Sequence, residues 1–539
     1  MKKTINEILV DFMNLLEIKY CFGIPGSNMS LLDEINKNKK INLILTKHEE
    51  SAGFMASGYT KSTGKISSCF GSVGPGATNL ITSVASAYYD SQPILILSGQ
   101  VKQDFWGRNA FQESTGKKQT ISQLNLFKEI TSYSVILKSE KYLKTILETA
   151  YQKLTSEKPG PVYIEIPVNI MDRKVNIPRN FFSFKKFIVP KDKKLNYKIR
   201  FSAIQLGNAK NPLILVGAGG LKFGKEIKEI AKKLSCPIVT TLKGRGVISE
   251  KDKYSLGTIG ITGQKGANEF LNSNVDYLLV IGSSLGQFTT NHWESKIKES
   301  KIIRIDIHNP NVTNNFKEYL ALKGDIKKII NKLNYNLKIK KKKSFRDYKI
   351  EYDAKSLQKK NNIHPAYFTK LLRDNLPKDS IICTEQIAWV EKYFKIYKPR
   401  TQIACTGFAP IGCSLAESIG VKFGNKNKVV VSFQGDGGFN MSGLEIMTAK
   451  NYNLSILFIV LDNEVLGPIY QAQKKKYKSS FMTEFKNPSF SNLAKGFGIQ
   501  SITIKNKNNI KPLIKKALTH IQKGNSVLLN VKVDKNAKW

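Results

Sequence analysis

Two short apolar runs of this 539-residue chain are each followed by a short polar segment. This pattern is typical of neighbouring strands that end at the same edge of a parallel sheet. Residues 429–433 precede Gly435-Asp436-Gly437, and residues 456–461 precede Asp462-Asn463. Both runs are rich in β-branched and aromatic residues, as buried parallel strands are. Residues 441–451 between them have helical spacing. The segment therefore predicts a strand–helix–strand crossover.

This crossover would bring Asp436 and Asn463 side by side at the carboxyl ends of neighbouring strands, where open α/β sheets bind ligands. A carboxylate, an amide oxygen and free backbone carbonyls are hard ligands that suit a Mg²⁺ ion shared with a phosphate group. The flanking glycines would let a diphosphate approach the backbone. Turns also use Asp and Gly, but the spacing and the two apolar runs favour a ligand site.

Strand-like and helical segments alternate in three blocks, which predicts an α/β protein with three doubly wound parallel-sheet domains. The length also requires about three domains. We predict domains over residues 1–180, 195–335 and 350–539, joined by linkers at 178–194 and 338–343. The predicted strands are 41–45, 66–70, 93–97 and 162–166 in the first block, 212–216, 237–240, 277–281 and 302–305 in the second, and 380–383, 429–433, 455–461 and 526–531 in the third.

The formal net charge of +43 raises the question of a nucleic-acid partner. The lysines are spread over the whole chain, and their run at residues 340–343 falls in a predicted linker. We therefore expect no nucleic-acid partner. A segment of membrane-spanning length and a signal peptide are both lacking, so we also expect a cytoplasmic protein with no membrane partner.

The six cysteines are scattered, mostly within apolar runs, and form no CxxC pair. This pattern predicts buried thiols in a reducing compartment, and neither disulfides nor a zinc site. The residues concerned are Cys21, Cys69, Cys236, Cys383, Cys405 and Cys413.

The two polar pairs and their spacing resemble the diphosphate–magnesium motif of thiamine-diphosphate (ThDP) enzymes. The whole chain resembles the acetolactate synthase-like branch of that family, whose pyrimidine-binding, central and diphosphate-binding domains have the same order as the three blocks. The resemblance implies that Asp436, Asn463 and the backbone carbonyl of Val465 hold Mg²⁺. It also implies that Gly437 and Gly438 contact the diphosphate.

A helix of small residues is predicted to follow the strand at 41–45, and Glu49 lies at its start. Taken alone, Glu49 is a carboxylate stabilised by a helix N-terminus. However, His-Glu followed by Ala-Gly-Phe and Gly-Tyr resembles the segment that carries the family's activating glutamate. The resemblance implies that Glu49 hydrogen-bonds the pyrimidine ring of ThDP and promotes removal of the thiazolium C2 proton. Glu50 is the neighbouring alternative.

Two glycine-containing turns, at residues 22–28 and 71–79, flank this element. Both could simply be tight connections, but in the family such turns border the cofactor and the substrate. The resemblance implies cofactor contacts for Gly26, Gly74 and Asn79, and a substrate contact for Asn28. Because acetolactate synthases usually have a small residue at the position of Asn28, we expect a substrate of different size or polarity.

Two further segments resemble parts of the family's active site. Phe111 and Gln112 correspond to residues that face the reacting carbonyl, although Phe111 could also be a core residue. Ile411 corresponds to the hydrophobic residue beneath the cofactor, which holds ThDP bent so that its reacting groups meet; ordinary packing is the alternative. The neighbouring Gly412 is expected to contact the cofactor.

The chain also departs from the family's pattern. Thr384-Glu385-Gln386 stands where the family often has Gly-Gln-His, and the segment after Asn463 lacks the tryptophan of biosynthetic acetolactate synthases. These contacts cannot be carried over. In the central block, residues 282–288 lack the Arg/Asp pattern of flavin-binding relatives. We therefore expect no FAD and a purely structural central domain.

The resemblance implies a Mg²⁺- and ThDP-dependent enzyme that decarboxylates a 2-oxo acid. Carboligation to a second carbonyl is the favoured outcome, because residues 91–123 lack the histidine pair with which simple decarboxylases often donate a proton. A non-oxidative decarboxylase is one alternative. A non-catalytic homologue is another, against which the presence of Glu49, Asp436 and Asn463 argues. Since the family's active sites lie between subunits, we expect a homodimer or homotetramer.

Overall fold

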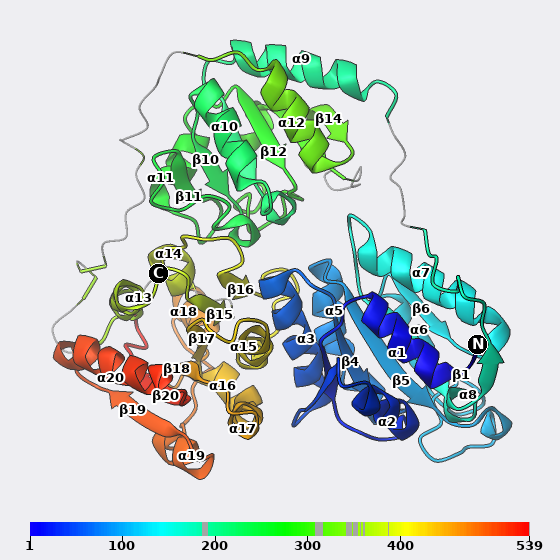
Figure 1. Ribbon diagram of the computed structural model, residues 1–539. Helices are drawn as coiled ribbons and strands as arrows, with labels where there is room; N and C mark the ends of the chain where they lie inside the picture. The colour runs from blue at the N-terminus through cyan, green and yellow to red at the C-terminus, as the bar shows by residue number, and fades with distance from the viewer. Residues whose placement is uncertain are drawn as a thin grey trace.

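The computed structural model describes residues 1–185, 192–307, 316–340, 348, 354–355, 357–358, 362–385 and 388–537. Three domains follow one another along the chain, coloured from blue to cyan, green, and yellow to red in Figure 1. Each contains a six-stranded parallel sheet flanked by helices. The predicted fold class is confirmed.

In the first domain the strand order is β3-β2-β4-β5-β7-β6, and a small antiparallel pair, β1–β8, joins the start of the chain to the end of the domain. The strands are β1 (Lys2–Thr4), β2 (Tyr20–Gly23), β3 (Asn42–Leu45), β4 (Ser67–Gly71), β5 (Ile94–Gln100), β6 (Tyr133–Ile136), β7 (Val162–Pro167) and β8 (Lys174–Asn176). The helices are α1 (Ile5–Leu15), α2 (Met29–Asn38), α3 (Glu49–Thr63), α4 (Pro75–Thr78), α5 (Ile81–Tyr89), α6 (Gln123–Lys128), α7 (Leu143–Thr155) and α8 (Val168–Met171).

The central domain has the order β11-β10-β9-β12-β13-β14, the arrangement of dinucleotide-binding sheets. Its strands are β9 (Leu213–Val216), β10 (Ile238–Thr240), β11 (Ser255–Thr258), β12 (Tyr277–Ile281), β13 (Lys301–Asp306) and β14 (Glu318–Lys323). The helices are α9 (Leu195–Asn208), α10 (Gly224–Leu234), α11 (Lys265–Leu271) and α12 (Ile326–Asn336).

The third domain repeats the topology of the first, with the order β16-β15-β17-β18-β20-β19. Its strands are β15 (Ile381–Thr384), β16 (Gln402–Ala404), β17 (Val430–Gly435), β18 (Ile456–Asp462), β19 (Gln500–Ile504) and β20 (Val527–Lys532). The helices are α13 (Pro365–Asn375), α14 (Ala388–Tyr393), α15 (Cys413–Gly424), α16 (Asp436–Ser442), α17 (Ile446–Asn451), α18 (Gly467–Tyr477), α19 (Phe490–Gly496) and α20 (Ile510–Gln522).

Every strand predicted from the sequence is present, and each boundary lies within three residues of the predicted one. The short pair β1 and β8 was not predicted, nor were β2, β6, β11, β14, β16 and β19 of the three large sheets, all of which except β2 form sheet edges. The domain boundaries remain predictions. Residues 186–191 of the first linker, residues 341–343 of the second, and residue 350 lie outside the described residues.

The first and third domains share one apolar core. Helix α3 packs against α15, and a methyl group at Gly58 or Gly420 would collide with the backbone of the opposite helix. One buried cluster includes Met55 on α3 and Ile419 on α15, whereas the central domain has separate clusters. Close helix contact through glycines therefore fixes the first domain against the third within one chain.

A buried charge network lies at the same contact. The ammonium group of Lys61 on α3 is 2.7 Å from Oε1 of Glu417 on α15 and 3.0 Å from Oδ2 of Asp90. Lys243 of the central domain also pairs with Asp90. Burial lowers the pKa of Lys61, but Cys405, Glu417 and Asp90 together hold it well above its ordinary value. The network joins all three domains.

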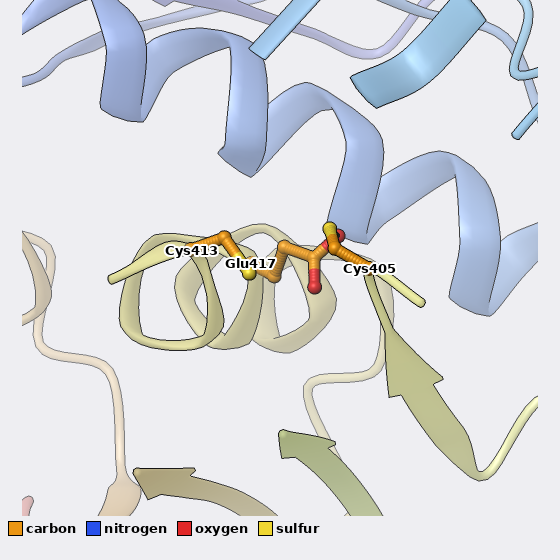
Figure 2. A group of neighbouring side chains, drawn as sticks. All are labelled: Cys405, Cys413 and Glu417. Carbon is orange, nitrogen blue, oxygen red and sulfur yellow. Dashed lines mark hydrogen bonds between the residues drawn. The ribbon is translucent and has the colours of Figure 1, made fainter. Parts of the chain in front are cut away.

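Figure 2 shows Cys405, Cys413 and Glu417 gathered beneath α3. All six cysteines are free and buried, as predicted. The hydrogen bond to Cys405 and burial raise the pKa of Cys413 well above its usual value. Cys405, Cys413 and Glu417 are close enough together to hold a metal ion. However, the ammonium nitrogen of Lys61 lies 3.2 Å from the sulfur of Cys405, so a positive charge is already present beside them.

Candidate active site

The crossover predicted from the sequence ends at the topological switch point of the third domain. From β15 the chain continues to β16 on one side and then to β17 on the other, so the loops after β15 and β17 diverge. Gly435 of β17 pairs with Leu461 of β18, which brings the residues that follow both strands together. Ligands of open α/β sheets bind at such points.

Asp436 and Asn463 meet at this edge. The carboxylate of Asp436 is buried, and its Oδ2 accepts hydrogen bonds from the backbone N–H groups of Asn463 at 2.9 Å and Glu464 at 2.6 Å. The N–H of Gly437 donates to Oδ1 at 2.9 Å. Burial raises the pKa of Asp436, although these hydrogen bonds oppose the shift. Among the described residues Asp436 has no ion pair, so its buried charge suits a metal cation.

Asn487 also supports this acid, although it was not recognised from the sequence. Its Nδ2 atom donates to Oδ2 of Asp436 at 2.7 Å and to Oδ1 of Asp462 at 3.0 Å. Asp462 also forms an ion pair with Lys532 at 2.7 Å. No motif marks Asn487, because it lies on a loop that reaches the site only after folding.

The chain turns sharply beside these residues. Glu464 has a φ of +58°, and the N–H of Val465 donates to Oδ1 of Asn463 at 3.3 Å. Val465 is buried. The turn keeps Asn463 and Val465 close together at the end of β18. Coordination of Mg²⁺ by Asp436, Asn463 and Val465 remains a prediction.

Glycines leave backbone accessible next to the acid. A methyl group at Gly437 would lie 2.8 Å from the side chain of Leu466, and one at Gly438 would collide with both carboxyl oxygens of Glu385. Gly412 has a φ of +86° and precedes α15. Only glycine fits these positions without strain or displacement. The resulting cradle fits the backbone approach that a diphosphate requires.

Glu385 occupies one wall of this cradle. It directly follows β15, and its Oε1 atom accepts a hydrogen bond from the N–H of Gly412 at 2.7 Å. Burial raises the pKa of Glu385 to about 7. The neighbouring Gln386 and Ile387 lie outside the described residues.

The two glycine turns of the first domain meet at its own switch point, between β2 and β4. The N–H of Ser27 donates to Oγ of Ser72 at 3.0 Å, and a methyl group at Gly26 would collide with that serine. Gly74 has a φ of +67°, and its N–H donates to Oε1 of Gln123 at 2.9 Å. Gln123 was not recognised from the sequence.

Glu49 begins α3 and is buried, with an exposed fraction of 8%. Nδ2 of Asn79 donates to its Oε2 atom at 2.9 Å. The carboxylate of Glu445 accepts from the N–H groups of Lys47 at 2.9 Å and His48 at 3.1 Å. A residue of the third domain thus fixes the loop that presents Glu49.

The predicted substrate residues differ in burial: Asn28 is buried, whereas Phe111 is exposed. Asn28 is 1% exposed, and neither amide atom of its side chain has a hydrogen-bond partner among the described residues. Phe111 is 87% exposed, so the core interpretation is wrong. Gln112 follows it with a φ of +59°. Ile411 is 52% exposed, so it is not an ordinary packed side chain either.

The chain matches three family models in domain order. These are the N-terminal TPP binding domain of thiamine pyrophosphate enzymes over residues 3–121, the central domain over residues 199–333, and the C-terminal TPP binding domain over residues 384–531. Within the described part of the chain, no helix has the length and apolar character needed to cross a membrane.

Curated relatives agree with these matches. The chain is 30% identical to a probable acetolactate synthase large subunit of Methanococcus aeolicus, with 95% of this chain and 89% of the relative covered. The same values apply to the corresponding protein of Methanocaldococcus jannaschii. An acetolactate synthase large subunit of Porphyra purpurea is 28% identical over 99% of this chain and 92% of its own length. The chain therefore belongs to the acetolactate synthase-like branch of the ThDP-dependent enzymes and acts on a 2-oxo acid.

Proposed function

We propose that the protein requires Mg²⁺ as well as ThDP, decarboxylates its 2-oxo acid, and joins the remaining fragment to a second carbonyl compound. The direct contact between Asp436 and Asn463 at the switch point carries the metal and cofactor part of this proposal. Carboligation is supported by the acetolactate synthases among the relatives, and by the lack of histidine in residues 91–123.

In this proposal the third domain holds the charged end of the cofactor. The carboxylate of Asp436, the amide oxygen of Asn463 and the carbonyl of Val465 bind Mg²⁺, which prefers such oxygen ligands. Gly412, Gly437 and Gly438 expose backbone toward the diphosphate. The metal neutralises phosphate charge that the buried Asp436 carboxylate would otherwise repel.

The first domain holds the pyrimidine end. ThDP supplies the carbon nucleophile for the 2-oxo carbonyl and accepts the electron pair released when CO₂ leaves. Glu49 holds a proton at the pyrimidine nitrogen, and the hydrogen bond from Asn79 fixes its orientation. Gly26 and Gly74 border the cofactor, and Ile411 supports its bent shape. The substrate lies near Asn28, Phe111 and Gln112.

The active site is completed by a second copy of the chain, in a homodimer or homotetramer. Phe111 and Ile411 are both exposed in the single chain, although each is assigned to the active site. The partner subunit would cover them and would bring a diphosphate-binding domain to Glu49. Exposed apolar side chains that flank a site commonly mark such an interface.

The central domain is proposed to be structural and without FAD. The loops after β9 and β12 flank its switch point, and they contact each other. The N–H of Gly219 donates to the carbonyl of Gly282 at 3.1 Å, and a methyl group at Gly217 would collide with that carbonyl. This contact supports a closed crevice. A cytoplasmic location is also proposed, because all six thiols are free.

Purified protein with Mg²⁺ and ThDP would be tested for CO₂ release from pyruvate, with and without a second oxo acid or an aldehyde. Formation of a ligated product that matches the CO₂ released is the expected result. Release of CO₂ with accumulation of the free aldehyde would instead establish the decarboxylase alternative. Failure to bind ThDP would identify a non-catalytic homologue.

A further inference from the structure

We propose that Glu385 is part of the diphosphate site in its neutral acid form. One carboxyl oxygen accepts the N–H of Gly412, and the other carries a proton that it donates to a phosphate oxygen of the cofactor. Binding of ThDP then depends on the protonation of this one side chain. The inference rests on the proposed location of the diphosphate.

The position of Glu385 supports this role. It follows β15, whereas Asp436 follows β17, so the two acids lie just beyond the carboxyl ends of the two strands that define the switch point. Its Oε1 atom is 2.7 Å from the nitrogen of Gly412 and 3.4 Å from Oγ of Ser414. A methyl group at Gly438 would collide with both of its carboxyl oxygens. The carboxyl group therefore lies against the glycine backbone to which the phosphates are assigned.

An ionised Glu385 would oppose cofactor binding. It is buried, and among the described residues it forms no ion pair. A buried carboxylate next to a diphosphate would place like charges together, and the Mg²⁺ proposed at Asp436 is not paired with Glu385, so this repulsion would weaken binding. A neutral acid removes this repulsion and supplies the hydrogen-bond donor that a phosphate oxygen requires.

The surrounding groups favour the neutral form. Burial is the main cause that raises the pKa of Glu385 to about 7; the charge of Glu417 on α15 adds to it, and hydrogen bonds from Gly412 and Ser414 act in the opposite direction. Lys61 on α3 is paired with Glu417 and Asp90, and the thiol of Cys413 faces Glu385 from the start of α15. An incoming diphosphate adds negative charge, so it raises the pKa again.

The affinity for ThDP should decrease as the pH rises, because binding requires protonated Glu385. Below about pH 6, Glu385 is already protonated in the free protein and adds no pH dependence to binding. Above about pH 7, the free protein must take up a proton to bind ThDP. The affinity should therefore fall by up to about tenfold for each further pH unit.

Calorimetric titration of the full-length protein with ThDP at saturating Mg²⁺, from pH 6 to pH 9, tests this inference. Glu385→Gln keeps the neutral donor at every pH. Between pH 7.5 and 8.5, the fall in the affinity of the wild type for ThDP should therefore be about tenfold larger than the fall in the affinity of Glu385→Gln. The terminal phosphate of ThDP titrates near pH 6, but it contributes equally to both proteins. Glu391→Gln is a matched control, because Glu391 is another buried carboxyl group whose pKa is raised by burial, at the contact with the central domain.

A second measurement uses the wild type alone, in buffers with different heats of ionisation. Binding at pH 8 should take up roughly one proton, whereas a phosphate that meets a metal ion releases protons. The role of Glu385 would be overturned if the ThDP affinities of the wild type and Glu385→Gln changed equally with pH. It would also be overturned if the wild type took up no proton on binding. If neither protein binds ThDP at any pH, the proposed diphosphate site itself is wrong.

Discussion

The amide nitrogen of Asn79 lies 2.9 Å from Oε2 of Glu49 and donates a hydrogen bond to it. The two residues come from different elements, since Asn79 follows α4 and Glu49 begins α3. The donor fixes one carboxyl oxygen of Glu49 and leaves the other for the proposed contact with the cofactor. This hydrogen bond fixes the orientation of the buried Glu49 carboxyl group.

Replacement of Glu49 by Gln should leave ThDP binding within a few-fold of the wild type, because the glutamine carbonyl still accepts from Asn79. Turnover should fall by about 10² to 10⁴, the contribution typical of a positioned acid or base. Calorimetry for binding and CO₂ release for turnover measure the two effects. Glu50→Gln is the matched control and should retain wild-type turnover. Wild-type rates in Glu49→Gln would refute the proton-holding role.

The charge network between the domains should contribute to the stability of their contact, beside the apolar core that they share. Lys61→Met would leave Glu417 buried without its cation at the packed face of α3 and α15, and would remove one of the two cations beside Asp90. Loss of one partner of a buried ion pair typically costs about 3–5 kcal/mol. Urea unfolding should show this loss. The double variant Lys61→Met/Glu417→Gln should recover part of it, and Lys65→Met, at an exposed position, should change stability little.

If Lys61→Met were as stable as the wild type, the network would not stabilise the contact. If the double variant were less stable than the single one, the uncompensated charge of Glu417 would not be the cause. Both comparisons use the same unfolding measurement, so differences in the unfolded state largely cancel.

Glu165 should make stability depend on pH. It is buried on β7, where Gln100 donates to it at 2.7 Å, and burial raises its pKa from 4.5 to about 7. Because the folded form holds the proton more tightly, this stabilisation is complete below about pH 4.5 and is lost as the pH rises to about 7. The difference amounts to about 3 kcal/mol. Glu165→Gln should flatten this part of the stability profile.

Unfolding free energies measured between pH 4.5 and pH 8 would check this prediction. Glu129→Gln removes one exposed carboxylate from the same domain and serves as the control. Equal slopes for the wild type and Glu165→Gln would show that the proton is not held more tightly in the folded state.

The sequence predicted every interior strand except β2, because β-branched and aromatic apolar runs such as residues 456–461 are typical of buried parallel strands. Edge strands are exposed on one side, so their patterns are weaker. β14, for example, alternates irregularly between half-buried and exposed residues, and β6 is half-buried throughout. β11 was missed for another reason, since it is buried but short and contains Gly257.

For the candidate site, motifs placed Asp436 next to Asn463 because strand register fixes residues that directly follow paired strands. Asn487 and Gln123 could not be predicted in this way. Both reach the site from loops or helices whose positions depend on tertiary packing. The exposure of Phe111 and Ile411 was also not foreseen, because an isolated apolar residue in a sequence does not indicate whether its own chain covers it.

Mixing two inactive variants would decide whether the active site is shared between subunits. Asp436→Ala should lose Mg²⁺-dependent binding of ThDP, and Glu49→Gln should lose turnover. If each site takes Glu49 from one chain and Asp436 from the other, as proposed, a mixed dimer contains one site with both defects and one site with neither. Random exchange after dissociation and reassociation should therefore restore about a quarter of the wild-type activity.

Recovery should require exchange, so the variants mixed without dissociation should remain inactive and serve as the control. Asp374→Ala, which removes an exposed acid of the third domain, should be active before and after mixing. If the site lay within one chain, every chain in the mixture would carry one defect and no activity would return. An inactive exchanged mixture, with wild-type protein recovering fully under the same treatment, would thus refute the shared site.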